Sequence, residues 1–214
     1  MNIAIFGASG PTGLLLTEQA LQSGHKVTAF VRHSNRMPLT HNSLQITVGN
    51  VLQAKDVELT VAGQDAILLA LGASGTSQPH LCSEGTRLIV QAMKNLGVRR
   101  IVALTGVGTS RVNRNELRIR NQWMTWLTAA LFWKEFRDKV MQDRCLRGSG
   151  LDWTIIQPQL LTDGPWTGRF SLDAARLPLV SWVSRADVAG FMLQLLESRD
   201  LIGQSTVIYS KKEL

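Results

Sequence analysis

The sequence predicts an α/β fold: a doubly wound parallel sheet with helices on both faces, built as one domain. Apolar, β-branched runs alternate with segments of helical periodicity along most of the 214 residues. Some runs, such as AILLAL, are apolar throughout, which is typical of strands buried on both faces of a parallel sheet. A glycine-rich loop joins the first run to the first helical segment, as in a strand–turn–helix unit.

The first half of the chain alternates regularly between strands and helices. Gly24 and Gly97 end two of the helices, since glycine is the preferred residue just past a helix end. The expected strands are residues 1–6, 26–32, 44–49, 64–71 and 99–106, and the expected helices are residues 12–23, 54–61 and 84–96.

The second half continues the same pattern. Residues 141–147 end a helix that Gly148 breaks, and residues 151–158 form a strand that ends at a proline. Residues 185–197 carry apolar side chains at helical spacing, and residues 205–210 form a last strand. No internal repeat or low-complexity linker divides the chain, so one domain over residues 1–214 is expected.

Composition indicates a soluble globular protein, with 44% hydrophobic and 18% charged residues. The first residues lack the basic segment of a signal peptide, and no apolar run is long enough to cross a membrane. Cys82 and Cys145 do not have the spacing of metal ligands, and no cluster of His, Cys and Asp suggests a metal site. We therefore expect free thiols in a reducing, cytoplasmic compartment and no bound metal.

The net charge of +7 is concentrated in one part of the chain. Residues 99–147 hold 11 Lys or Arg and 4 Asp or Glu, so the remaining residues are balanced. A local basic excess attracts anions such as a phosphorylated cofactor, nucleic acid or an anionic membrane. The chain carries no recognised nucleic-acid-binding module, so no nucleic-acid partner is expected.

The loop IAIFGASGPTG carries the clearest functional signal. Gly7, Gly10 and Gly13 follow a strand and open a helix. In a dinucleotide-binding loop the first glycine permits a tight turn, the second lets the backbone approach the pyrophosphate, and the third lets the helix pack on the sheet. Amide groups at the helix start then face the negative charge. The loop therefore predicts a nucleotide cofactor.

Other residues of this region indicate which nucleotide is bound. Ser9 and Thr12 add hydroxyl donors, and Pro11 suits the first helical position. An NAD site usually has an acidic residue at the end of the second strand, where this chain has Arg32, with Arg36 close behind. A guanidinium suits the 2′-phosphate of NADP, so NADPH is favoured over NADH.

Several segments together resemble one family. They are GASGPTG, VTAFVR, VGNVLQAKDVELTVAGQDAILLALG, SEGTRLIVQAMKNLGVRRIVALT, LRGSGLDWTIIQP and VSRADVAGFMLQLLE. The chain resembles the atypical short-chain dehydrogenase/reductases with NmrA-like NAD(P)H-binding domains, and among them the biliverdin reductase B and NADPH-dependent flavin reductase group. The resemblance covers nearly the whole chain apart from residues 110–136, and it implies a Rossmann-like fold.

The resemblance also implies a set of cofactor-binding residues. The glycine loop would hold the pyrophosphate and Arg32 the 2′-phosphate. The other implied positions are Asn50 and Val51 by the adenine, Leu71, Gly72 and Ala73 along the ribose, Thr105 and Gly106 at the nicotinamide, and Pro158, Gln159 and Leu160 closing over it.

The catalytic residues of related enzymes are partly missing. Short-chain reductases use a Tyr-x-x-x-Lys pair, whereas the matching stretch here, EFRDK, has Glu135 and Lys139. The chain has a single tyrosine, Tyr209, and Gln159 replaces the histidine of the resembled group. Lys139 is expected to bind the nicotinamide ribose or to be a surface lysine. Gln159 is expected to hold the carboxamide or the substrate, although it cannot transfer a proton at neutral pH.

This pattern favours one class of acceptor. Flavins such as FMN and biliverdin-like tetrapyrroles spread the incoming charge over a conjugated system, so orientation on the nicotinamide supplies most of the catalysis. The sequence therefore predicts an NADPH-dependent reductase of a flavin or a related planar conjugated acceptor. The alternative is a non-catalytic NADP-binding redox sensor or assembly factor.

A Trp- and Arg-rich helical insertion is expected at residues 110–137. Trp123, Trp126 and Trp133 share one helical face, which favours burial as core or as a lid over the cofactor. A helix at the membrane interface and a subunit interface are the two other interpretations. The sequence does not distinguish a monomer from a homodimer.

Overall fold

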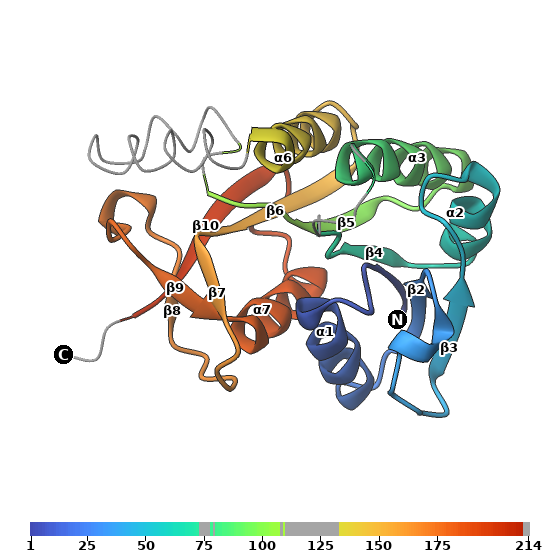
Figure 1. Cartoon of the computed structure of the whole chain (residues 1–214), viewed down its shortest axis with the longest axis horizontal. Coiled ribbons are helices and arrows are strands. Elements are labelled where there is room, and N and C mark those ends of the chain that lie inside the picture. The colour runs from blue at the N-terminus through green and yellow to red at the C-terminus, as the bar shows by residue number, and fades with distance from the viewer. Residues whose placement is uncertain (73–77, 79, 108, 110–132, 212–214) are drawn as a thin grey trace.

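The structure is a computed structural model, and it describes residues 1–72, 78, 80–107, 109 and 133–211. Within these residues the chain forms a mostly parallel sheet of eight strands in the order β3-β2-β1-β4-β5-β6-β10-β8 (Figure 1). The strands are β1 Asn2–Phe6, β2 Lys26–Val31, β3 Leu44–Val48, β4 Ala66–Leu69, β5 Arg100–Leu104, β6 Asp152–Pro158, β8 Phe170–Ser171 and β10 Gln204–Ser210.

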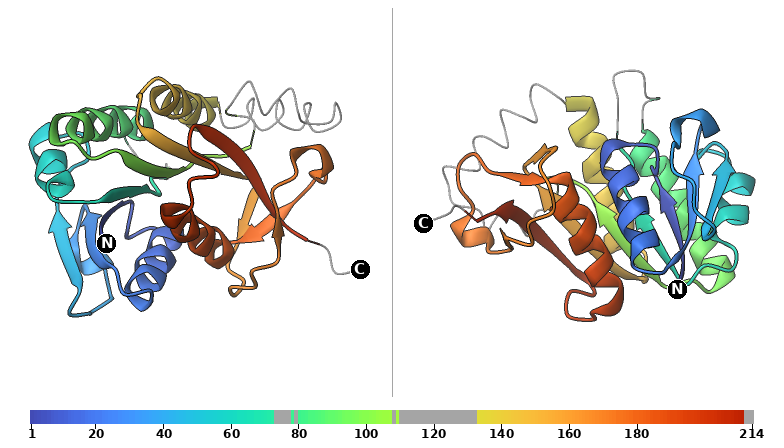
Figure 2. Two further views of the ribbon diagram at one scale, coloured as in Figure 1. Left: turned by 180° about the vertical axis from the view of Figure 1, so that it is seen from behind. Right: turned by 90° about the horizontal axis from the view of Figure 1, so that it is seen from below.

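Helices cover both faces of the sheet (Figures 1 and 2). The helices α1 and α7 pack together on one face, and α2, α3 and α6 form a row on the other. Their bounds are α1 Pro11–Gln22, α2 Ala54–Val61, α3 Leu81–Leu96, α6 Trp133–Arg147 and α7 Arg185–Glu197. The predicted doubly wound, Rossmann-like single domain is confirmed.

Each face of the sheet has its own hydrophobic core. Along β1, Ile3 and Ile5 belong to the core beneath α1 and α7, whereas Ala4 and Phe6 belong to the core beneath α2, α3 and α6. All four side chains are fully buried. Successive side chains of a strand point to opposite faces, so a central strand covered on both sides needs an apolar residue at every position. This explains why the runs seen in the sequence do not alternate.

Short strands beyond residue 158 were not predicted. The strands β7 (Leu160–Thr162) and β9 (Trp182–Ser184) form a separate parallel pair, and β8 pairs antiparallel with β10, so the main sheet is not wholly parallel. The chain also has single turns of 3-10 helix, η1 (Ser34–Arg36) and η2 (Ala174–Arg176). Elements of two or three residues are too short to show a hydrophobic period.

The loop before β8 is held by a buried carboxylate. The Asp187 side chain accepts hydrogen bonds from the backbone N–H groups of Thr167 and Gly168, at 2.7 and 2.9 Å. The preceding residue, Trp166, lies on α7 at Gly190, where an added Cβ would be only 2.1 Å from the indole Cζ3. The loop therefore packs on α7 through the indole of Trp166, and this packing requires glycine at position 190.

Helix α3 begins three residues before the predicted start, and a distant residue explains this. The Asp138 carboxylate of α6, which is buried, accepts hydrogen bonds from the N–H groups of Cys82 and Ser83, each at 2.8 Å. These amides belong to the first turn of α3, which would otherwise lack acceptors. A carboxylate at a helix start is also favoured by the helix dipole. The cap comes from another helix, so no local sequence signal announces it.

Most of the predicted Trp- and Arg-rich insertion lies outside the described residues. Residues 110–132, including Trp123 and Trp126, are not described, and residues 133–137 form the first part of α6. Trp133 is exposed there. Among the helices that the structure describes, none is both long and apolar enough to cross a bilayer.

Replacing Asp138 with Ala is expected to lower the free energy of unfolding by about 2 kcal/mol, because a buried and a part-buried N–H group of α3 lose their acceptor. Urea denaturation measures this change. Asp173→Ala is the matched control, since Asp173 also accepts a backbone N–H at a helix start but is exposed and caps only η2. Equal losses in the two variants would contradict the structural importance of the Asp138 cap.

Candidate functional site

The loop after β1 passes in close backbone contact with the end of β4. Gly7 has a φ of +85°, and an added Cβ would lie 2.5 Å from the carbonyl oxygen of Ala70. At Gly13 an added Cβ would lie 2.1 Å from the carbonyl oxygen of Gly7. The Gly10 N–H donates to that same oxygen at 3.0 Å, which closes the turn. The positions Gly7 and Gly13 therefore admit no side chain.

The start of α1 is open for an anion. Gly10 is the N-cap and Pro11 the first helical residue, and no side chain caps the helix. The first turn of α1 contains no acidic residue. Ser9 is half-buried and Thr12 is buried. A helix start has backbone N–H groups without intrahelical acceptors and a positive dipole end, so this one suits a phosphate.

The remaining predicted positions lie at the same edge of the sheet as this loop. Parallel strands have their carboxyl ends on one side, and ligands bind there in open α/β sheets. Arg32 follows β2, Leu71 and Gly72 follow β4, Thr105 and Gly106 follow β5, and Pro158, Gln159 and Leu160 end β6 and begin β7. Ala73 lies outside the described residues. The fold thus brings together residues that are more than a hundred positions apart.

The two arginines that favour NADP lie beyond the end of β2. Arg32 is exposed and directly follows the strand, and Arg36 is exposed at the end of η1. Neither guanidinium forms an ion pair with another residue of the described part of the chain. Both are therefore available to an anionic ligand.

The Asn50 turn is organised by its own hydrogen bonds. The Asn50 N–H donates to the Asp56 carboxylate at 2.9 Å, and the Asn50 side-chain oxygen accepts from the Leu52 N–H at 3.0 Å. Val51 is buried and packs against α3 at Gly85, where an added Cβ would lie 2.9 Å from Val51 Cγ2. The exposed Asn50 therefore offers mainly its amide NH2 group to a ligand.

Lys139 makes contacts that its sequence position did not suggest. Its ammonium Nζ donates to the carbonyl oxygen of Leu71 at 2.6 Å, to that of Leu104 at 3.2 Å and to Gln142 Oε1 at 2.9 Å. Gln142, which is fully buried, in turn donates to the Thr86 hydroxyl at 3.1 Å. An ammonium has three N–H donors, so protein acceptors match all of them.

A buried thiol lies beside this ammonium. The Sγ of Cys82 is 3.8 Å from the Leu71 carbonyl oxygen, and the residue is fully buried. Burial raises the pKa of the Cys82 thiol above its ordinary value, although the charge of Lys139 acts in the opposite direction. Cys82 is therefore a protonated packing residue at neutral pH.

Gln159 holds a neighbouring loop. Its Nε2 donates to the Leu179 carbonyl oxygen at 2.9 Å, and its Oε1 accepts from the Ser181 N–H and hydroxyl, each at 2.8 Å. The next residues, Leu160 and Trp182, are register partners in the β7–β9 pair. The amide of Gln159 therefore fixes the strand that carries Trp182 against the end of β6.

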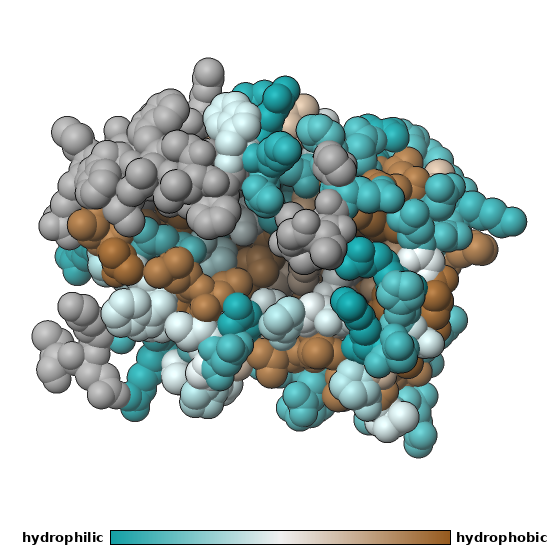
Figure 3. Space-filling view, viewed as in Figure 1, coloured by the Kyte–Doolittle hydropathy of each residue, from teal (hydrophilic) through white to brown (hydrophobic). Residues whose placement is uncertain are grey.

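An exposed apolar surface results, which we call the Trp182 shelf and define as Leu160, Val180 and Trp182. These side chains are 49%, 45% and 53% exposed. Leu160 and Trp182 are register partners in a parallel pair, so their side chains point to the same face of that pair. Val180 lies in the bend just before β9. In Figure 3 hydrophobic residues gather over β7, β9 and the loop between them. The shelf begins directly after the end of β6.

Sequence reasoning missed a buried polar cluster at the ends of β5 and β6. Gln157, which is fully buried, donates from Nε2 to the Thr109 hydroxyl at 2.7 Å. That hydroxyl donates to the Gly106 carbonyl oxygen at 3.0 Å and lies 3.3 Å from the Thr105 hydroxyl. A glutamine within an otherwise apolar strand was the available signal. The cluster shapes the turn that carries Gly106.

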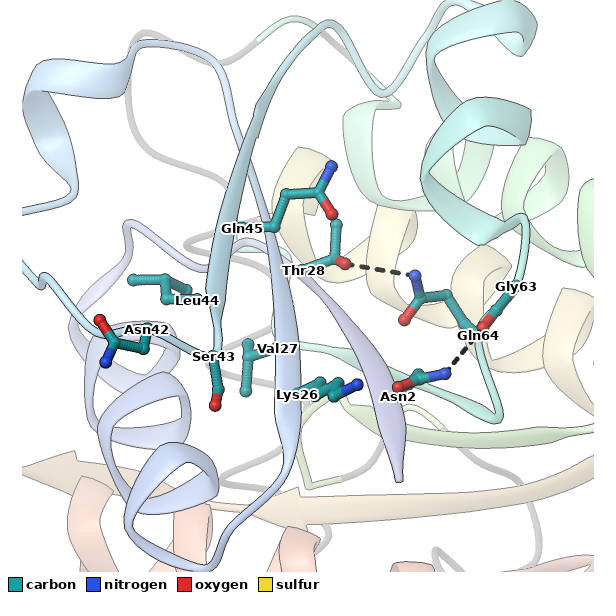
Figure 4. A pocket seen from close by; sticks show the side chains of 10 residues that line it. All are labelled: Asn2, Lys26, Val27, Thr28, Asn42, Ser43, Leu44, Gln45, Gly63 and Gln64. Carbon is teal, nitrogen blue, oxygen red and sulfur yellow. Dashed lines mark hydrogen bonds between the residues drawn. The ribbon is translucent and has the colours of Figure 1, made fainter.

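A separate hollow lies at the opposite edge of the sheet (Figure 4). It has a volume of about 430 Å³, and Asn2, Lys26 and Leu44, which begin β1, β2 and β3, line it. Its wall also contains Gln64, whose Nε2 donates to the Thr28 hydroxyl at 3.2 Å. None of the predicted cofactor-binding residues lines this hollow.

Comparison with known families shows the family of the chain. The family described as NAD(P)H-binding matches residues 7–199. The chain belongs to this NAD(P)H-binding family. The match begins at the glycine loop and extends beyond Trp182, so it includes the whole site described above.

One relative in sequence and two solved structures are similar to this chain over nearly its whole length. YwnB of Bacillus subtilis is 25% identical, and the match covers all of both chains. The structure of ChuY, an anaerobillin reductase from Escherichia coli O157:H7, has a TM-score of 0.81 and 22% identity, and covers 100% of this chain and 99% of that one. A Veillonella parvula short-chain dehydrogenase/reductase in complex with NADP has a TM-score of 0.81 and 20% identity, and covers 98% and 94%. These likenesses show the fold.

Replacing Gly13 with Ala is expected to abolish NADPH binding and to lower the melting temperature by several degrees, because the new Cβ would lie 2.1 Å from a carbonyl oxygen. Calorimetry of cofactor binding and thermal unfolding measure both effects. Gly148→Ala is the control, since its Cβ would make only an ordinary contact at 3.4 Å. Normal NADPH affinity in the Gly13 variant would rule out the loop as the binding site.

Proposed function

We propose that the protein is an NADPH-dependent reductase that transfers hydride to a flavin, a biliverdin-like tetrapyrrole or another planar conjugated acceptor. The observation that carries the proposal is the Trp182 shelf. It places a half-exposed indole and two aliphatic side chains on the strand pair that directly follows the carboxyl end of β6. A flat aromatic acceptor buries apolar area on such a surface, and an indole offers it a stacking face.

The choice of NADPH rests on charge. The loop from Gly7 to Gly13 suits a pyrophosphate, because its glycines pack closely against backbone and the first turn of α1 has no side-chain cap. Arg32 and Arg36 add two guanidinium groups where the second strand ends. A guanidinium binds a 2′-phosphate through paired hydrogen bonds, whereas the two ribose hydroxyls of NADH would leave its charge unmatched. The solved structure with NADP bound has the same fold.

The choice of acceptor rests on the positions of the proton donors. Tyr209 lies in β10, is buried, and donates its hydroxyl to the Asp173 carbonyl oxygen at 3.2 Å. Glu135 occupies the usual tyrosine position and is exposed on α6. Reduction of an isolated ketone requires a proton at the developing alkoxide. A conjugated acceptor delocalises that charge and takes its proton from water, so this chain suits it better.

The residues of this chain bind and orient the reactants. When bound, the reduced nicotinamide supplies a hydride, and the acceptor takes that hydride and one proton from water. The loop and Arg32 hold the phosphates, while Thr105 and Gly106 form the backbone floor at the end of β5. Gln159 holds Ser181 and hence the strand of Trp182, so the acceptor plane is set by the protein. These residues contribute to the rate by orienting the acceptor relative to the nicotinamide.

A redox sensor is the second candidate. The observation that favours it is that Lys139 and Gln159 both donate hydrogen bonds to protein oxygens. These two side chains are therefore occupied within the protein and do not serve an acceptor. A sensor needs the cofactor loop but no acceptor site. It would bind NADPH and carry out no turnover.

Replacing Arg32 with Ala is expected to weaken NADPH binding about 30-fold, because a charge-assisted hydrogen bond to the 2′-phosphate is lost. NADH binding should change less than twofold, since NADH has no phosphate at that position. Titration calorimetry with both cofactors measures the two changes. Equal losses for NADPH and NADH would overturn the assignment of Arg32.

NADPH oxidation by the purified protein is expected with FMN, FAD or biliverdin, and not with a simple aliphatic ketone. Trp182→Ala should lower kcat/KM for the acceptor about tenfold, because the stacking surface is lost, and should leave the affinity for NADPH unchanged. Absorbance at the nicotinamide band measures turnover.

Trp166→Ala is the matched control for loss of a half-exposed indole. Trp166 is 46% exposed and lines a hollow with Gln22 and Glu197, where α1 and α7 end. Its loss should leave kcat/KM unchanged. Tight NADPH binding without turnover on any acceptor would support the sensor instead. Equal losses in both tryptophan variants would contradict the shelf.

A further inference from the structure

We propose that Lys139 is a positioning residue that ties together the cofactor-facing ends of β4 and β5, and that its ammonium donates neither to the cofactor nor to the acceptor. The proposal rests on the cofactor-binding part of the proposed function and not on the identity of the acceptor. From the sequence, Lys139 is expected either to bind the nicotinamide ribose or to be a surface lysine. The contacts of Lys139 assign it a different role.

The acceptors of Lys139 lie just past the end of a strand ladder. The ladder between β4 and β5 ends at the pair Leu69 and Ala103. The carbonyl oxygens of Leu71 and Leu104 lie beyond that last pair, where strand-to-strand hydrogen bonds have stopped. Lys139 donates to both, at 2.6 and 3.2 Å. The Lys139 side chain therefore links β4 and β5 beyond the last backbone hydrogen bond between them.

The lysine is itself held in place by its neighbours on α6. Gln142, one turn further along the helix, accepts the third N–H at 2.9 Å and is anchored to Thr86 of α3. Asp138, which precedes Lys139, accepts two amides at the start of α3. The Lys139 ammonium therefore donates to carbonyl oxygens, and the neighbouring Asp138 carboxylate accepts from amide N–H groups. Protein groups therefore fix the position of the ammonium.

The two carbonyl groups belong to residues that directly precede expected cofactor positions. Gly72 comes after Leu71, and Thr105 comes after Leu104. Gly72 is expected along the ribose and Thr105 at the nicotinamide. The spacing between them is set by the ammonium, so Lys139 acts on the nicotinamide half of the site through the backbone. Each of its three donors would have to leave a protein oxygen before reaching a ribose hydroxyl.

Calorimetry with two ligands tests the positioning role. Lys139→Met keeps the length of the side chain but removes the N–H donors. It should weaken NADPH binding about tenfold, the effect of losing one net hydrogen bond to a charged group. Binding of 2′,5′-ADP, which lacks the nicotinamide half, should change less than twofold. Lys134→Met, which removes an exposed lysine from the same helix, should alter neither affinity. Wild-type NADPH affinity in the Lys139 variant would overturn the proposal.

Nuclear magnetic resonance of the unmodified protein separates positioning from direct donation and does not require a variant to fold. The scalar coupling across the hydrogen bond between the ζ-nitrogen of Lys139 and the carbonyl carbon of Leu71 should be present both with and without saturating NADPH. Loss of this coupling on binding would show that the ammonium turns to the cofactor, and would overturn the proposal. Absence of turnover would leave both measurements unaffected.

Discussion

Backbone lies against backbone where the loop after β1 crosses the end of β4, and the site depends on that contact. Gly7 has no space toward the Ala70 carbonyl oxygen, and Gly13 has none toward Gly7. This closeness lets α1 begin directly above the sheet edge, with its uncapped first turn facing the ends of the strands. Larger residues would push α1 outward and move the amides away from a pyrophosphate. The shape of the glycine loop is thus a product of packing between main chains.

The polar side chains around this edge mostly support the protein itself. Lys139 joins two strand ends, Gln159 holds the strand of Trp182, and Gln157 fixes the turn after β5 through Thr109. The surfaces left for ligands are backbone amides, exposed guanidinium groups and an aromatic shelf. Groups of these kinds suit phosphates and flat rings, and few of them can transfer a proton. This division of labour supports the proposed hydride transfer to a conjugated acceptor.

Patterns within one segment of the chain predicted the elements that depend on local residues. Helices over 54–61 and 185–197 were placed with both ends as observed, and the loop from Gly7 to Gly13 was placed on its strand and helix. Features decided by distant partners were not predictable. Asp138 caps α3 from α6, β7 pairs with β9 some twenty residues later, and the role of Lys139 depends on which carbonyl oxygens the fold brings to it. The residue types indicated which side chains could belong to the site. The role of each side chain depends on the hydrogen-bond partners that the fold brings to it.

The seat of Trp166 on Gly190 has a consequence for how this sequence can change over generations. The indole of Trp166 occupies the space that a side chain at position 190 would need, so a change at either position affects the other. A methyl group can arise at position 190 without strain only in a lineage that has already lost or moved the ring. The reverse order passes through an intermediate in which two groups claim the same volume. A substitution that removes or moves the Trp166 ring must therefore come before a larger residue at position 190.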